Sequence, residues 1–150
     1  MAKKIAFACD HRGFDFKAPI LDFLKKKNYE VLDCGTFSSE STDYPDYMFK
    51  AAEKVSRGEC EKAIGVCYTG IGSTIAANKV KGVRAALVQS VKEAELSRAH
   101  NDSNMLILGS GFLNPSKLLP IIETWLTTVF EGGRHGERVN KIKSYEQNHG

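Results

Sequence analysis

The chain has 150 residues, 42% of them hydrophobic and 26% charged, and a formal net charge of +3. We expect one soluble domain spanning residues 1–150, because this length suffices for a hydrophobic core. The small charge, with no basic stripe, argues against a nucleic-acid partner, and no apolar run is long enough to span a membrane.

The four cysteines form neither a CxxC pair nor a zinc-ligand spacing. The apolar run that follows the N-terminus is too short for a signal peptide. These features predict a reduced, cytoplasmic protein without a metal site.

The first third of the chain predicts two buried strands, at residues 3–10 and 29–35, separated by a helix over 14–27. The strands are short apolar runs, whereas the helix has apolar residues at helical spacing. Residues 36–46 are polar and contain Pro45, which is typical of a loop.

The middle of the chain predicts a helix from about Tyr47 to Arg57 and a strand that ends at Cys67. A glycine-rich turn follows this strand. A helix is then expected over residues 73–80 and a further strand over 83–88.

The last third predicts a helix over 90–101, a strand over 104–110 and a long amphipathic helix over 116–132. A second, highly charged helix begins near Arg134, after a pair of glycines. This alternation predicts an α/β fold, a three-layer sandwich in which helices cover both faces of a mostly parallel five-stranded sheet.

Polar side chains follow two of the predicted strands. Asp10 and His11 come after the first strand, and Cys67 and Thr69 lie at the end of the third. Ligands of such sheets bind beyond the carboxyl ends of the strands, so these residues predict a site there. Taken singly, Asp10 and His11 are also compatible with an ordinary helix cap.

The turn after Cys67 places the backbone N–H groups of residues 69–73 at the start of a helix. Unpaired donors and the helix dipole favour an anion at such a position, and a cysteine beside it is placed to react as a thiolate. The alternative is a buried strand-end thiol next to an ordinary connection. The turn lacks the GK[ST] of a P-loop and is not a full GxGxxG, so a nucleotide is not indicated.

The charged C-terminal helix has few apolar side chains with which to pack on its own domain. Arg134 and Arg138 are four residues apart, and this spacing suits a shared phosphate or carboxylate. Alternatively, both arginines form surface ion pairs with Glu131 and Glu137. His100, near the end of a helix, is similarly compatible with a favourable interaction with the helix dipole alone.

Six segments occur together in a characteristic order and spacing: FACDHRGFDFK, DCGT, TDYPDY, CYTGIGSTIAANKVKGVRAAL, LSRAHNDSN and EGGRHGERV. From Lys4 to about Glu146 the chain closely resembles the type B ribose-5-phosphate isomerases, in the wider family that includes the galactose-6-phosphate isomerase subunits. The resemblance implies a Rossmann-like domain in a homodimer or tetramer, with the C-terminal helix packed on a partner subunit. It also implies interconversion of ribose 5-phosphate and ribulose 5-phosphate through an enediolate, without metal or cofactor.

The resemblance also implies roles for individual residues. Cys67 matches the base that moves a proton between C2 and C1 of the open-chain sugar, and Thr69 matches the hydroxyl residue beside it. His100 matches the residue that opens the furanose ring. The matches for the anion hole around the enediolate oxygen are Gly70, Ile71, Gly72, Ser73 and Asn101.

The remaining matches concern substrate binding. Asp10 and Tyr44 match residues near the sugar hydroxyls, and His11 matches a residue on the phosphate side. Arg134 and Arg138 match arginines that reach the phosphate in the site of the neighbouring subunit.

Two positions distinguish this chain within the resemblance. Ser73 stands where one branch of the family has a glutamate base, so the chain matches the cysteine branch. Gly111 stands where many relatives have a phosphate-contacting arginine, so we expect the phosphate clamp to be weaker, rearranged, or supported by another group such as Arg12. The open alternatives are an isomerase of allose 6-phosphate, galactose 6-phosphate or a free sugar, and an inactive subunit that binds sugar phosphates.

Overall fold

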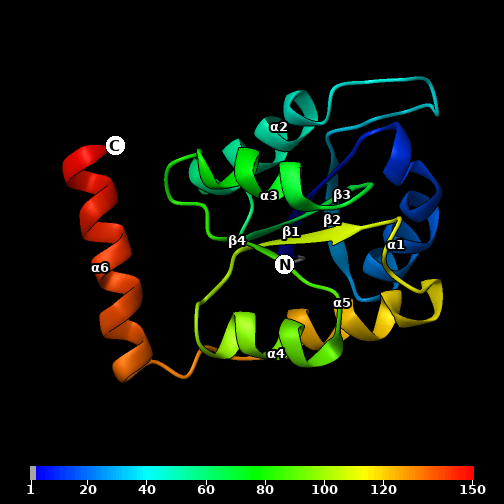
Figure 1. The fold of residues 1–150 in the computed structure, drawn as a ribbon. Coiled ribbons are helices and arrows are strands. Elements are labelled where there is room, and N and C mark those ends of the chain that lie inside the picture. Colours follow the sequence, from blue (N-terminus) through cyan, green and yellow to red (C-terminus); the bar gives the residue numbers. More distant parts are fainter. Residues whose placement is uncertain (1–2) are drawn as a thin grey trace.

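A computed structural model describes residues 3–150, which form a five-stranded sheet with helices on both faces (Figure 1). All strand pairs are parallel, in the order β2-β1-β3-β5-β4, which confirms the predicted α/β class. The strands are β1 (Lys3–Cys9), β2 (Tyr29–Asp33), β3 (Lys62–Cys67), β4 (Ala85–Leu87) and β5 (Met105–Gly109). The helices are α1 (Phe14–Lys26), α2 (Tyr44–Ser56), α3 (Ile71–Asn78), α4 (Val91–Ala99), α5 (Leu118–Thr127) and α6 (Arg134–His149), with short 3-10 turns at His11–Gly13 and Pro115–Lys117.

Each face of the sheet has its own core. Helices α1, α4 and α5 cover one face, where Phe7 and Trp125 are fully buried among large apolar side chains. Helices α2 and α3 cover the other face, where β1 presents Ala6 and Ala8 instead. Because strand side chains alternate between faces, one apolar run supplies both cores.

Three helix boundaries differ from the sequence-based expectation. Helix α2 begins at Tyr44 rather than near Tyr47, because Pro45 occupies its first turn, where its missing N–H is not needed. Helix α3 begins at Ile71, two residues before the predicted start. Helix α5 ends at Thr127, since Thr128 adopts an extended conformation (ψ 127°), well before the glycine pair.

The strand order fixes where a ligand can bind. From β1 the chain passes through α1 to β2 on one side, whereas β3 lies on the other side of β1. Parallel sheets form a crevice at such a switch in direction, beyond the carboxyl ends of the two strands. Here that crevice lies between Asp10, which follows β1, and Cys67, which ends β3.

Helix α6 stands apart from the sandwich, yet residues of its own chain hold it at several points (Figure 1). Val139 is buried, and the Glu146 carboxylate accepts a hydrogen bond from the Gly82 N–H at 2.7 Å. Ile142 and Tyr145 are 54% and 67% exposed. Helix α6 therefore presents apolar side chains that its own chain does not cover.

Within residues 3–150, no helix combines the length and the apolar character needed to cross a membrane.

Candidate active site

A cavity of about 380 Å³ lies at the carboxyl edge of the sheet, in the crevice between β1 and β3. It brings together predicted site residues from β1, α2, β3 and the turn before α3. Its lining residues are Asp10, Tyr44, Cys67, Tyr68, Thr69, Ile71 and Gly72. We call this group, with the neighbouring His11 and Ser73, the carboxyl-edge half-site.

Cys67 is the cysteine that faces this cavity. The turn folds back so that the Gly70 N–H donates a hydrogen bond to its Sγ at 3.2 Å. Gly70 has φ +80°, and a Cβ there would lie 2.3 Å from a Leu87 methyl group, so only glycine fits. Cys9 and Cys60 do not line this cavity, and burial raises the pKa of their thiols to about 11.

The turn uses some of its N–H groups internally and leaves others available. The Ile71 N–H donates to the Thr69 hydroxyl at 3.0 Å, and that of Gly70 is bound to Cys67. Within residues 3–150, the N–H groups of Gly72 and Ser73 have no partner outside the helix, and the first turn of a helix offers them none. These two donors are free for a ligand anion, whereas the N–H groups of Gly70 and Ile71 are used within the turn.

Tyr44 approaches the turn closely because of Gly72. A Cβ at Gly72 would lie 2.4 Å from the Tyr44 hydroxyl oxygen, so any larger residue would displace the phenol. Beside them, the hydroxyl of the buried Ser73 has no hydrogen-bond partner within residues 3–150.

Asp10 and His11 are fixed by the backbone. The Asp10 carboxylate accepts hydrogen bonds from the N–H groups of Arg12 (2.9 Å) and Gly13 (3.1 Å). His11 Nδ1 accepts from the Thr42 N–H, and the His11 N–H donates to the Thr42 hydroxyl, both at 3.2 Å. With Nδ1 as acceptor, the neutral ring carries its proton on Nε2, which remains available as a donor.

His100 and Asn101 do not reach this cavity within one chain. They follow α4, which returns the chain to the amino edge of the sheet before β5 begins. Met105, at the start of β5, pairs with Ala63, whereas Cys67 pairs with Gly109. The Ala63–Met105 pair and the Cys67–Gly109 pair are four residues apart along the strands, a length of about 13 Å.

A second group, which joins predicted site residues to His135 and Glu131, lies near the start of α6; the sequence analysis did not single out His135. The His100 ring stacks on that of His135, with centroids 4.1 Å apart and planes inclined by 9°. The Glu131 carboxylate lies 3.6 Å from His135 Nε2, and Arg134 begins α6. We call the residues His100, Asn101, Glu131, Arg134, His135 and Arg138 the amino-edge half-site.

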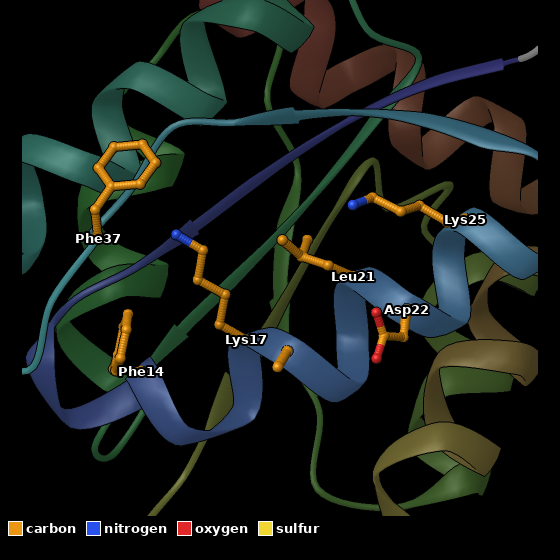
Figure 2. A pocket seen from close by; sticks show the side chains of 7 residues that line it. Phe14, Lys17, Leu21, Asp22, Lys25 and Phe37 are labelled. Carbon is orange, nitrogen blue, oxygen red and sulfur yellow. The ribbon is translucent and has the colours of Figure 1, made fainter.

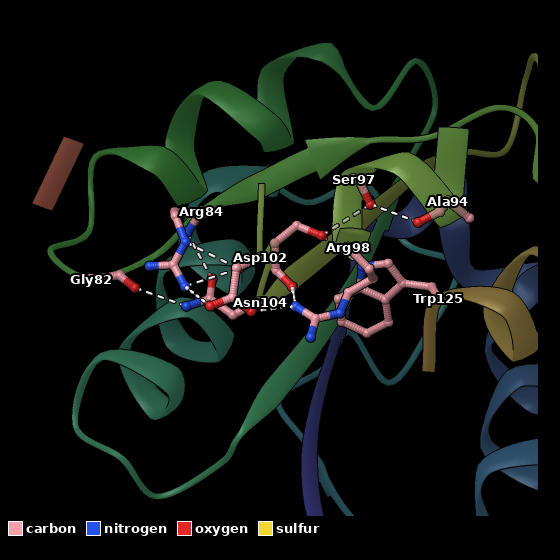
Figure 3. A network of polar contacts seen from close by, with 9 residues as sticks. Gly82, Arg84, Ala94, Ser97, Arg98, Asp102, Asn104 and Trp125 are labelled. Atoms are coloured by element: carbon pink, nitrogen blue, oxygen red, sulfur yellow. Dashed lines mark hydrogen bonds and ion pairs between the residues drawn. The ribbon is translucent and has the colours of Figure 1, made fainter. Parts of the chain in front are cut away.

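A polar network holds the segment that carries His100 and Asn101 (Figure 3). Arg84 donates to the carbonyl of Asp102 at 2.9 and 3.1 Å, and Arg98 pairs with the Asp102 carboxylate at 2.9 Å. Ser103 accepts a hydrogen bond from the buried Trp125 indole at 2.9 Å. The sequence analysis missed this network because its members come from four separate segments.

The His100–His135 stack bears on whether the amino-edge half-site could bind a metal. Ligand atoms of His100, Glu131 and His135 lie within 4.8 Å of one another. However, Zn–N bonds of about 2.0–2.1 Å run close to the imidazole plane. An ion cannot lie in two nearly parallel ring planes, so this arrangement does not favour chelation.

The face that carries α1 has a separate cavity of about 340 Å³ (Figure 2). Lys17 is its central cation, but it is already bound to Asp33 (2.8 Å) and to the carbonyl of Thr36 (2.6 Å). Phe37 lies over this ammonium group, 4.1 Å from it. The cavity contains none of the predicted site residues, and its contacts fasten the loop after β2 to α1.

Known proteins resemble this chain over almost its whole length. The family model described as "Ribose/Galactose Isomerase" matches residues 5–142. Ribose-5-phosphate isomerase B of Escherichia coli is 46% identical over 145 residues, covering 97% of each chain.

Solved structures agree with this result. The ribose-5-phosphate isomerase B of Clostridium thermocellum is 48% identical with a TM-score of 0.95, covering 98% of this chain and 99% of that one. The Mycoplasma genitalium enzyme, solved with bound ribulose-5-phosphate, is 43% identical with a TM-score of 0.94, covering 98% of each chain.

Proposed function

The chain belongs to the ribose/galactose isomerase family, and from this we propose that it interconverts ribose 5-phosphate and ribulose 5-phosphate. The observation that carries the proposal is the position of Cys67, in a cavity beside the free N–H groups of Gly72 and Ser73. Residues 1–150 form one sugar-phosphate isomerase domain in this proposal.

Cys67 acts as the base on the open-chain sugar. Its thiolate removes the proton from C2. The C2–H electron pair forms the C1–C2 double bond, and the carbonyl pair moves to O1, giving an enediolate. The thiol then returns the proton to C1, while the hydroxyl proton passes from O2 to O1. The same atoms are present before and after, so the step needs no external oxidant or reductant.

The turn stabilises the charge that develops during this transfer. The N–H groups of Gly72 and Ser73 point from the start of α3, where the helix dipole favours an anion. The Thr69 hydroxyl, held against the Ile71 N–H, borders the same space. On the phosphate side, the Nε2–H of His11 is an available donor.

A second copy of the chain completes the site. His100 and Asn101, with Arg134 and Arg138, lie at the opposite edge from Cys67, so one protomer supports only half of the chemistry. A two-fold homodimer would join the carboxyl-edge half-site of one protomer to the amino-edge half-site of the other, giving two sites. Exposed Ile71 and Ile75 beside one half-site, and Ile142 on α6, support apolar contact with such a partner.

In the shared site, the partner contributes three functions. His100 of the partner subunit opens the furanose ring, and Asn101 of the partner subunit assists the anion hole. Arg134 and Arg138 of the partner subunit bind the phosphate. The four free cysteines support the reduced cytoplasm as the location.

The test is isomerase activity of the metal-stripped protein on ribose 5-phosphate, compared with allose 6-phosphate and unphosphorylated ribose. We expect the highest kcat/KM for ribose 5-phosphate. Preference for allose 6-phosphate would move the substrate to the hexose phosphates and leave the role of Cys67 unchanged. No turnover of any of the three by the purified chain would favour the inactive-subunit alternative.

A further inference from the structure

Three residues from different segments meet at the rim of the carboxyl-edge half-site: Arg12, Tyr68 and Gly111. The guanidinium carbon of Arg12 lies 4.0 Å from the centroid of the Tyr68 ring. Tyr68 lines the cavity directly beside Cys67. Arg12 therefore stacks on a ring that lines the cavity containing the thiol.

Gly111 leaves the space that this stacking of Arg12 on Tyr68 requires. A Cβ at residue 111 would lie 2.4 Å from a carbon of the Tyr68 ring, so any side chain there would displace the ring. The Gly111 N–H also donates to the Tyr68 carbonyl at 2.8 Å, and Phe112 contacts the ring edge-on at 5.9 Å. The missing side chain at residue 111 is thus what allows an arginine to stack next to the cavity.

The backbone of Arg12 is fixed on both sides. Its N–H donates to Asp10 at 2.9 Å, and its carbonyl accepts a hydrogen bond from the Ser110 hydroxyl at 2.7 Å. The guanidinium group, however, makes no ion pair or hydrogen bond with any of residues 3–150, unlike the ammonium group of Lys17. Arg12 is thus a positioned cation whose guanidinium donors have no partner among the described residues.

We propose that Arg12, stacked on Tyr68 above Gly111, is a specificity-determining residue that binds the phosphate of the substrate within its own protomer. A guanidinium stacked on a ring keeps its in-plane N–H groups free, and these match two phosphate oxygens. Its neighbour His11 offers Nε2–H to the same anion. This inference rests on the proposed function and assigns its phosphate specificity to a residue on the same chain as Cys67.

The first test is kinetic. Arg12→Gln should raise KM for ribose 5-phosphate by about 10- to 100-fold with little change in kcat, since the phosphate is remote from the reacting carbons. The preference for ribose 5-phosphate over unphosphorylated ribose, as a ratio of kcat/KM, should fall by the same factor. Arg57→Gln is the matched control, because Arg57 follows the last residue of α2 and pairs with Glu53. Unchanged KM in Arg12→Gln would overturn the proposal.

A second variant tests the stacking of Arg12 on Tyr68 without removing a charge. Gly111→Ala should displace the Tyr68 ring and raise KM for ribose 5-phosphate in the same direction. In the double variant, Arg12→Gln with Gly111→Ala, the effects should be less than additive, because both changes remove one interaction. Fully additive effects would show that Gly111 acts independently of Arg12.

A binding experiment separates this inference from the proposed function. In a Cys67→Ala background without turnover, titration calorimetry with ribose 5-phosphate and with inorganic phosphate measures affinity alone. Arg12→Gln should weaken both ligands in this background. That result would stand even if the unmutated chain failed to isomerise ribose 5-phosphate. Conversely, normal isomerisation with unchanged phosphate affinity in Arg12→Gln would refute only the role of Arg12.

Discussion

The two half-sites lie at opposite edges of one sheet and are built in different ways. The carboxyl-edge half-site is formed mainly by backbone, with N–H groups bound to Cys67 and Asp10 and glycines that leave room for neighbouring rings. The amino-edge half-site is formed by side chains, a histidine stack and a turn held by Arg84 and Arg98. One half-site therefore lines a preformed cavity, whereas the other presents arginines that serve a partner's cavity in the proposed dimer.

The largest expected effect comes from disabling the carboxyl-edge half-site in one copy of the chain and the amino-edge half-site in another. Cys67→Ala removes the base and should lower kcat by about 100- to 10,000-fold, and His100→Ala should also leave little activity. Mixed and allowed to exchange, the two inactive variants should recover about a quarter of normal activity, because half of the dimers are mixed and each has one intact site. The measurement is turnover of ribose 5-phosphate by the mixture.

The control is each variant exchanged with itself, which should stay inactive. Recovery would require residues of two chains in one site. No recovery, with mixed dimers demonstrated by two different affinity tags, would contradict the shared site.

A smaller effect is expected from the arginines of the amino-edge half-site. Arg138→Ala should raise KM for ribose 5-phosphate by about 10-fold, with a smaller change in kcat, because it acts on the phosphate. Lys143→Ala is a matched control, since Lys143 lies about 140° around α6 from Arg138. Equal kinetics for the two variants would show that Arg138 is only a surface charge.

The smallest effect concerns the pH dependence of stability. Burial lowers the pKa of His135, and neighbouring His100 lowers it further. The unfolded chain, with an ordinary histidine pKa of about 6.5, then binds more protons than the folded chain below that pH, so folding is destabilised as the pH falls through 6.5. Chemical unfolding between pH 7.5 and 5.5 should show this slope, and His135→Gln should flatten it.

The same substitution at His149, near the C-terminus, is the control for the loss of a histidine. If the slope persists in His135→Gln and disappears in His149→Gln, then His149 and not His135 causes the pH dependence, and the prediction is wrong.

Local sequence predicted the features that depend on neighbouring residues. The strand ending at Cys67, the turn and the next helix lie in one continuous stretch, residues 62–78, so their geometry follows from glycine content and apolar spacing. The end of α5 was predicted too late, because apolar spacing continues through residues that Thr128 places in an extended segment.

Features that depend on strand order could not be predicted in this way. The separation of His100 from Cys67 follows from α4 returning to the amino edge, beside a β5 strand that pairs with β3. The contact of Gly111 with Tyr68 similarly joins the ends of two strands that are distant in sequence. Apolar patterns identify the strands but do not say which of them are neighbours.

The hydrogen bond from the Gly82 N–H to Glu146 links two positions outside both half-sites. Glu146 lies twelve residues beyond Arg134 on one continuous helix, about 18 Å along its axis. A rigid rod transmits a change at one end to the other, so the turn at Gly82 helps set where the arginines stand. If these arginines bind phosphate as proposed, selection on phosphate affinity would constrain changes in this distant turn.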